Sequence, residues 1–170
     1  LSEGASSASA ALPAEAPRPR HPLHPLAGVV GVFVCGLVAF LTLYSTQPLL
    51  PLFEALFHAS KSAVGWTVSA STLGVAIAAP LLGTFTERMN RKRVILISLV
   101  LMALPTCAAA TSNTLGWLVF WRLLQGLVTP GIFATTIAYI TEAWPPTAIA
   151  PVMSIYVSGT ALGGFSGRAV

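Results

Sequence analysis

Long stretches of this chain contain no charged side chain, and this feature limits its fold more than any other. Residues 26–44, 64–86 and 94–121 are all uncharged. A helix rises about 1.5 Å per residue, so roughly 20 apolar residues cross the hydrocarbon core of a bilayer. With 55% hydrophobic and only 8% charged residues, the chain cannot cover the surface of a water-soluble globule. The sequence therefore predicts an integral membrane protein.

The lengths of the apolar stretches predict helices and not strands. Strands of a membrane barrel are about ten residues long and alternate polar with apolar side chains, whereas these stretches are longer and continuously apolar. Breaks are expected at Pro48 and Pro51, at the polar turn 111–114 and at Trp-Pro-Pro 144–146. We therefore expect an all-α integral membrane protein with about five membrane-spanning helices, at about residues 26–47, 62–86, 93–110, 115–140 and 151–170.

The first 25 residues differ from the rest of the chain. Residues 1–25 are rich in Ala, Ser and Pro and show no apolar period, which predicts a disordered tail before the membrane domain at 26–170. The apolar run after this tail is longer than the core of a signal peptide and is not followed by a convincing cleavage site. The first helix is therefore expected to remain as an anchor.

Basic residues gather on one side of the predicted bundle. Arg18 and Arg20 of the tail fall on the same side as the cluster at 88–93, whereas Lys61 falls on the opposite side. Because cytoplasmic loops carry the excess of Lys and Arg, we expect the tail in the cytoplasm. Topology thus accounts for the net charge of +4, and we expect no nucleic-acid partner.

The polar residues of the chain are too few and too scattered to predict an enzyme. Cys35 and Cys107 both fall inside apolar stretches, no His or Cys pair has metal-ligand spacing, and the sequence contains no aspartate. A membrane-embedded enzyme would need carboxylates, histidines or a nucleophile clustered at one depth. We therefore expect no catalytic residue, no metal and no cofactor.

A strongly basic turn joins the second and third predicted helices. Its sequence, GTFTERMNRK at 83–92, resembles the signature G-x-x-x-D-R-x-G-R-R/K that follows the second helix in the major facilitator superfamily. Glu87 replaces the usual aspartate, and Asn90 replaces a glycine at a position where we expect a left-handed backbone, which Asn tolerates next best. The resemblance implies a charged latch that holds one state of a transporter. Its residues here are Gly83, Glu87, Arg88, Asn90, Arg91 and Lys92.

The same turn has a simpler interpretation. Its positive charges alone would fix the orientation of the chain in the membrane, with no part in a conformational change. The two roles can coexist.

The fourth predicted helix contains a second match, because Arg122-Leu-Leu-Gln125-Gly126 resembles the R-x-x-Q-G element of the same superfamily. An arginine at the centre of a membrane helix costs about 2.5–3.5 kcal/mol on insertion scales, so it should face water or protein. The resemblance implies a role in proton coupling, while the alternative is that Arg122 snorkels to the interface. At 100° per residue one polar face forms a candidate cavity wall, made of Arg122, Gln125, Gly126, Thr129, Phe133 and Thr136.

Glycines recur along the fifth predicted helix. This segment resembles the antiporter element G-x-x-x-G-P-x-x-G-G, but Gly164 stands in place of the proline and Arg168 in place of the last glycine. The alternative is an ordinary seam of close helix packing. The glycines concerned are Gly159, Gly163, Gly164 and Gly167.

The segment Tyr44-Ser-Thr-Gln47-Pro-Leu-Leu-Pro51, at the end of the first predicted helix, resembles bacterial sugar-efflux and drug-efflux permeases of the superfamily. Two roles are open for Tyr44 and Gln47. They either line a substrate path or, as is common for Tyr near the end of a membrane helix, anchor that end at the interface.

The resemblance covers residues 26–170 and implies the first part of a twelve-helix fold. It further implies a secondary transporter of the bacterial inner membrane that exports a small molecule in exchange for protons. Sugars and lipophilic cations are the compounds with which such export would be tested. Such proteins bind substrate between two halves, so the expected partners are membrane lipid, substrate, protons and a C-terminal half absent from this sequence. The acidic residues 54, 87 and 142 lie at or beyond helix ends, which places the proton-carrying carboxylate in that other half. The alternative is a remnant that packs with other membrane helices and transports nothing.

Overall fold

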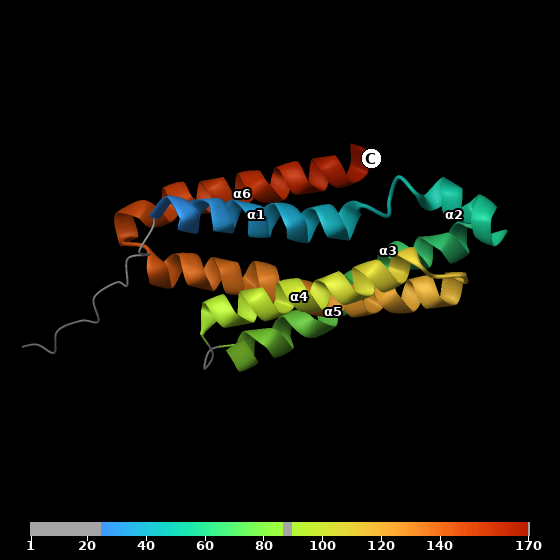
Figure 1. Cartoon of the computed structure of the whole chain (residues 1–170), viewed down its shortest axis with the longest axis horizontal. Helices are drawn as coiled ribbons and strands as arrows, with labels where there is room; N and C mark the ends of the chain where they lie inside the picture. The colour runs from blue at the N-terminus through green and yellow to red at the C-terminus, as the bar shows by residue number, and fades with distance from the viewer. Residues whose placement is uncertain (1–24, 87–89, 170) are drawn as a thin grey trace, which may run out of the picture.

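The structure is a computed structural model that describes residues 25–86 and 90–169 (Figure 1). Five of its helices are long and apolar enough to cross a membrane, and the described residues contain no strand. The prediction of an all-α protein with five spans is confirmed. The predicted tail at 1–25 lies, except for Pro25, outside the described residues. The helices are α1 (Pro25–Tyr44), α2 (Leu50–Phe57), α3 (Lys61–Thr86), α4 (Arg91–Ala110), α5 (Leu115–Ala143) and α6 (Pro146–Ala169).

The five long helices form two groups that lie side by side (Figure 1). Helix α1 packs along α6, while α3 and α4 pack on α5, and α5 also contacts α1 and α6. Helix α5 therefore joins the two groups. The starts of α1 and α4 and the link from α5 to α6 lie at one end of the molecule, and the link from α4 to α5 lies at the other.

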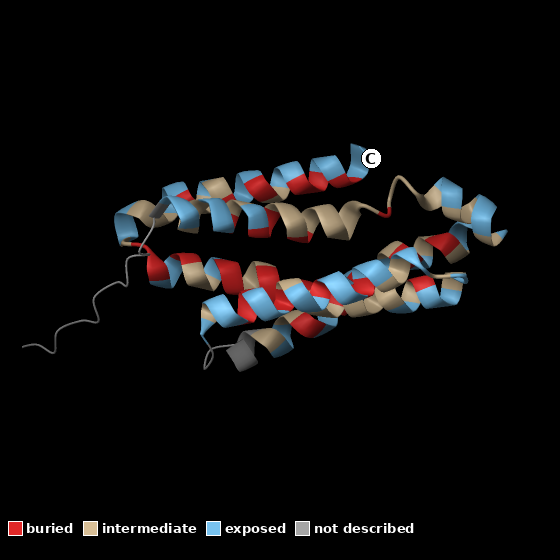
Figure 2. Ribbon diagram, viewed as in Figure 1, coloured by how far each residue is buried: buried red, intermediate tan, exposed pale blue. Residues whose placement is uncertain are grey.

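Buried residues are most frequent along α5 (Figure 2), and the buried glycines of α6 face α1. One apolar cluster joins α1, α5 and α6, with Ile140 and Tyr156 fully enclosed or nearly so. A second cluster joins α1, α4 and α5 around Ala39 and Ile132. Both clusters thus hold the α1–α6 pair against the α3–α4–α5 group.

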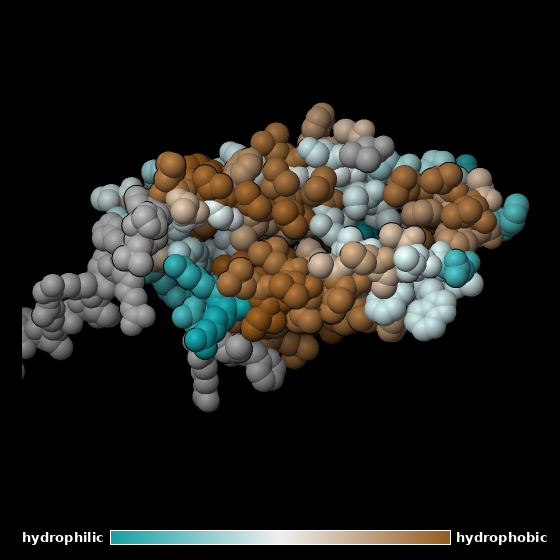
Figure 3. All heavy atoms as spheres, in the orientation of Figure 1, coloured by the Kyte–Doolittle hydropathy of each residue, from teal (hydrophilic) through white to brown (hydrophobic). Residues whose placement is uncertain are grey.

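The outer surface is apolar, as a lipid-facing surface must be. Leu96, Val100 and Leu104 follow each other at helical spacing on α4 and are 62%, 67% and 65% exposed. Figure 3 shows a broad hydrophobic surface over the middle of the molecule and a hydrophilic patch at the end where α4 begins. In a bilayer this face contacts hydrocarbon and not water, so the apolar side chains on the outside of the fold are in a favourable environment.

A short helix that the sequence analysis did not predict follows α1. Pro48 and Pro51 predict a break in the chain, yet α2 begins at Leu50 with a proline in its first turn. A proline is tolerated at that position because the first N–H groups of a helix have no helical acceptor. Helix α2 ends at Phe57, and its C-cap residue His58 has a left-handed φ of 48°.

Helix α6 begins five residues earlier than the expected start at 151. Its first residue is Pro146, and Pro151 lies inside the helix. The residue before a proline is driven to extended backbone, and the link between α5 and α6 is accordingly confined to Trp144 and Pro145, with φ and ψ of −111° and 148° at Trp144. The first proline of the pair therefore ends one helix and the second starts the next.

Candidate functional site

Arg122 lies inside the protein. It is 3% exposed, and of the charged side chains that the structure describes it alone is buried. Its Nη1 donates to the carbonyl of Thr42 at 3.1 Å and its Nη2 to the carbonyl of Leu43 at 2.8 Å. Both carbonyls belong to the last turn of α1, where a helix has carbonyl groups without helical donors and a partial negative charge. Arg122 therefore caps α1 from α5 and does not reach along its own helix to the interface.

Gln125 extends this network to α4. Its Oε1 accepts a short hydrogen bond from Nη1 of Arg122, and its Nε2 donates to Oγ1 of Thr106 at 2.7 Å. Thr106 in turn donates to the carbonyl of Met102 at 2.6 Å. Because arginine has only donors, it fixes the amide of Gln125 with its oxygen toward α1 and its nitrogen toward α4. One chain of hydrogen bonds thus links three membrane helices.

Two buried polar atoms in this region have no hydrogen-bond partner among the described residues. They are Nε of Arg122 and Oγ1 of Thr46, in the link that follows α1. A buried polar group without a partner costs about 1–3 kcal/mol. The Nε–H of Arg122 can therefore bind a further acceptor.

Most of the rest of the predicted polar face of α5 is buried inside the chain, at Gly126, Thr129 and Thr136. Gly126 packs against the main chain of Ser71 on α3, because the absence of a side chain lets the two backbones approach closely. The hydroxyls of Thr129 and Thr136 donate within α5, to the carbonyls of Gln125 at 2.8 Å and of Ile132 at 2.6 Å. Helical spacing predicted which residues share a face but not that this face is packed against other helices.

Asn90, in the basic turn, does not have the left-handed backbone that the sequence analysis expected. Its φ is −64° and its ψ is 115°, and its Oδ1 accepts from the backbone N–H of Lys92 at 3.1 Å. Asn90 is therefore the N-cap of α4, a position at which an extended backbone and an accepting side chain are favoured. Gly83 lies in α3, but the structure does not describe what surrounds it. Glu87 and Arg88 lie outside the described residues.

Arg91, also in the turn, binds the end of α5. Its Nη2 lies 2.9 Å from Oε1 of Glu142, and its Nε donates to both carboxylate oxygens, at 3.1 and 3.3 Å. Nζ of Lys92 lies 5.8 Å from the ring centre of Tyr139, one turn before Glu142. From the sequence alone, Glu142 is only an acidic residue near a helix end. Its place opposite the basic turn depends on how α4 crosses α5.

The glycines of α6 form a packing seam against α1. A Cβ atom at Gly159, Gly163 or Gly167 would meet the main-chain carbonyl of a residue on α1. Gly164 differs, because a Cβ there would lie 3.5 Å from the ring of Tyr44. The carbonyls that contact the first three glycines belong, in order, to Phe33, Leu37 and Leu41.

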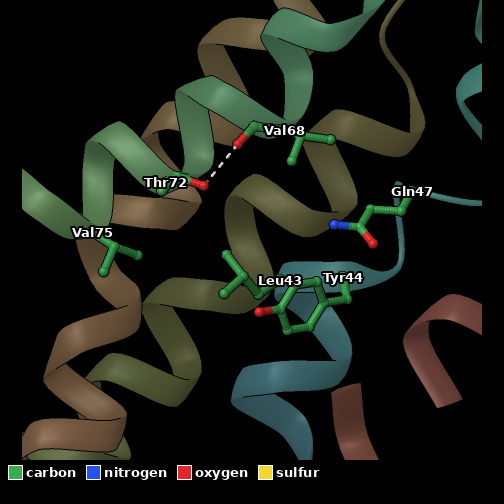
Figure 4. Close-up of a pocket in the computed structure, with 6 residues that line it drawn as sticks. All are labelled: Leu43, Tyr44, Gln47, Val68, Thr72 and Val75. Carbon is green, nitrogen blue, oxygen red and sulfur yellow. Dashed lines mark hydrogen bonds between the residues drawn. The ribbon is translucent and has the colours of Figure 1, made fainter. Parts of the chain in front are cut away.

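A pocket of about 160 Å³ opens between the end of α1 and α3. Figure 4 shows Leu43, Tyr44 and Gln47 on one side of it and three residues of α3 on the other. Tyr44 and Gln47 also contact α6, because Cζ of Arg168 lies 4.3 Å from the ring centre of Tyr44 and Nε of Arg168 donates to Oε1 of Gln47 at 3.1 Å. The residues of α3 are Val68, Thr72 and Val75.

These features define a class of protein. Five apolar spans packed in two groups, with a buried arginine that ties three helices together, form a polytopic α-helical membrane bundle with a polar network inside it. Comparison with known proteins gives the family. Residues 32–170 match the Major Facilitator Superfamily, and the chain belongs to that family.

Relatives with curated names support this assignment. An uncharacterized transporter of Buchnera aphidicola (subsp. Schizaphis graminum, strain Sg) is 33% identical over 140 residues, which are 82% of this chain and 34% of that protein. The inner membrane transport protein YnfM of Escherichia coli (strain K12) is 30% identical over 141 residues, 83% of this chain and 34% of that protein. The chain thus spans about a third of the length of these relatives.

The fold also resembles a solved transporter. The crystal structure of a bacterial homolog of the human lysosomal transporter Spinster, in an inward-facing and unoccupied conformation, matches with a TM-score of 0.76. The match covers 84% of this chain and 30% of that one, at 18% sequence identity. It shows that the helices are arranged as in part of a facilitator transporter.

Proposed function

We propose that this chain is part of a proton-coupled secondary transporter that exports a small molecule across the bacterial inner membrane, with the tail and the basic turn in the cytoplasm. Family membership and the names of the relatives support transport. The network around Arg122 is the observation that carries the proposal of coupling. Ionisable side chains inside a membrane are costly, face the protein interior and mark substrate, ion and proton pathways.

Arg122 would act as a fixed positive charge in the coupling step. A cation near a carboxylate favours the ionised form of that carboxylate, so approach of an acid to Arg122 would release a proton and withdrawal of that acid would bind one. In the described spans the acidic residues are confined to Glu142 near the end of α5. The proposal therefore places the titrating carboxylate on the part of the transporter that complements this chain.

The basic turn would act as the latch of the alternating cycle. Its members are proposed to be Gly83, Glu87, Arg88, Asn90, Arg91 and Lys92, and the pair between Arg91 and Glu142 supports this role. The side chain of Glu142 is 54% exposed and that of Arg91 is 16% exposed, and ion pairs at a protein surface contribute about 0–1 kcal/mol. A contact of that strength can form and break in each cycle, as a latch requires.

Reconstitution tests the proposal. The protein is expressed from its natural gene and placed in vesicles with an imposed pH gradient, and uptake or exclusion of a panel of sugars and lipophilic cations is measured. We expect gradient-driven flux that Arg122→Gln abolishes and Arg93→Gln retains, because Arg93 is an exposed arginine outside the network. Equal flux in both variants would remove Arg122 from coupling. Absence of flux for every compound, in correctly inserted protein, would favour a membrane protein that only packs with other helices.

A further inference from the structure

The pocket between α1 and α3 contains a hydrogen-bond donor whose direction is fixed. Gln47 uses its amide oxygen to accept from Nε of Arg168 at 3.1 Å. Because arginine can only donate, the oxygen must face α6 and the NH₂ group must face away from it. Figure 4 shows that nitrogen on the side of Gln47 nearer to α3, and Gln47 lines the pocket.

Tyr44 is held by the same arginine. The guanidinium of Arg168 lies over its ring at 4.3 Å, within the range of a cation–π interaction, and Gly164 leaves room for that ring beside α6. Tyr44 lines the pocket too, with its hydroxyl directed away from α6 in Figure 4. Arg168 therefore orients two pocket residues from outside the pocket.

The opposite wall offers little to a charged ligand. Val68 and Val75 are apolar, and the hydroxyl of Thr72 already donates to the carbonyl of Val68 at 3.2 Å. None of the pocket residues carries a charge. The pocket thus combines apolar walls with directed donors from the end of α1 and from the link that follows it.

We infer that this pocket is a substrate subsite for a neutral, mainly apolar group that carries one hydrogen-bond-accepting oxygen, such as a ketone or an ether. Gln47 donates to that oxygen, the side chains of Leu43, Val68 and Val75 contact the apolar body, and Arg168 is a positioning residue that sets the amide of Gln47. The volume of about 160 Å³ corresponds to about five water molecules at about 30 Å³ each, enough for one ring with a short substituent. The inference rests on the proposed function, because it gives a substrate class to the same transporter.

Cysteine protection tests the subsite without requiring transport. Thr72→Cys is introduced after Cys35→Ala and Cys107→Ser, and alkylation by N-ethylmaleimide is timed with acetophenone or with ethylbenzene, which has a similar shape but no oxygen. We expect acetophenone to slow alkylation at least threefold and ethylbenzene at the same concentration to slow it much less. Ser158→Cys, on the exposed face of α6, is the control for effects of either compound on the surrounding lipid or detergent.

Variants of Gln47 and Arg168 separate binding from folding. Gln47→Glu keeps an acceptor for Arg168 but removes the donor, so we expect it to abolish the advantage of acetophenone while the protein stays monodisperse. Arg168→Ala should reduce the advantage, and Arg168→Lys, which still donates to Gln47, should restore part of it. Equal slowing by both compounds, or protection that survives Gln47→Glu, would overturn the inference.

Flux is measured on the same preparation. Protection without gradient-driven flux of any compound would contradict the proposed function and would leave the pocket as a binding site. Flux without protection would overturn the subsite alone. Benzoate forms a further arm, and protection by benzoate but not by acetophenone would contradict the assignment to a neutral group.

Discussion

Nη2 of Arg122 on α5 donates to the main-chain carbonyl of Leu43 on α1 at 2.8 Å, although the two residues are 79 positions apart in the chain. This contact joins a positive charge to the negative end of a helix in a place where water is scarce. It also links the α1–α6 pair to the α3–α4–α5 group. The buried arginine is therefore a structural part of the bundle as well as the proposed coupling residue.

Loss of this cap should destabilise the protein. Arg122→Leu removes the donors to two α1 carbonyls and to Gln125, and we expect a loss of about 1–3 kcal/mol in the free energy of unfolding, the usual cost of buried polar groups that lose their partners. Denaturant unfolding in detergent measures it. Arg122→Lys, which keeps the charge but loses the forked geometry, should be intermediate. An Arg122→Leu variant as stable as the parent would show that the cap contributes nothing.

Glycines at helix crossings should respond differently from glycines that face outward. A Cβ at Gly126 would overlap the main chain of Ser71, whereas a Cβ at Gly116, on the same helix, would meet nothing within 4 Å. Gly126→Ala should therefore destabilise the α3–α5 crossing by about 1–3 kcal/mol, as overpacking does. Gly116→Ala should be neutral or slightly stabilising, since Ala is the better helix former. Equal unfolding midpoints for the two variants would contradict the close packing.

The bilayer explains why the spans could be predicted from the sequence. Any helix that crosses hydrocarbon must be long, apolar and nearly free of charge, and that condition can be tested segment by segment. Helix α2 was not predicted because it is too short to be a span and because Pro51 occupies its first turn, where a proline does not break a helix. The backbone conformation of Asn90 was predicted wrongly because an N-cap and a left-handed turn favour the same residue type.

The partners of the site residues could not be predicted in the same way. Arg91 and Glu142 are 51 positions apart, and Arg168 and Gln47 are 121 apart. Spacing along one helix says which residues share a face, but the crossing of two helices decides what that face meets. For this reason the motif residues of α5 were identified while the packing of Gly126 on α3 was not.

The pair of Arg91 and Glu142 should have a small and salt-dependent coupling energy. Single and double substitutions to Ala form a thermodynamic cycle, for which we expect about 0.2–1 kcal/mol at low ionic strength, less at high salt because screening weakens exposed charges. The exchange Arg91→Glu with Glu142→Arg should recover flux that either single reversal loses. Recovery would not occur if the two side chains acted separately, and a coupling energy unaffected by salt would contradict the exposed geometry.

The orientation of the bundle can be tested at two positions near opposite ends of the molecule. Lys92 at the start of α4 and Asn113 between α4 and α5 are both exposed, and about 20 helical residues, enough to cross a bilayer, separate them. With the basic turn in the cytoplasm, Asn113→Cys should react with a membrane-impermeant maleimide in intact cells, whereas Lys92→Cys should react only after permeabilisation. Both substitutions are made after Cys107→Ser, so that the exposed native thiol does not contribute. The reverse pattern would place the basic turn outside, and the latch and the proton-coupled export proposed above would then have the wrong polarity.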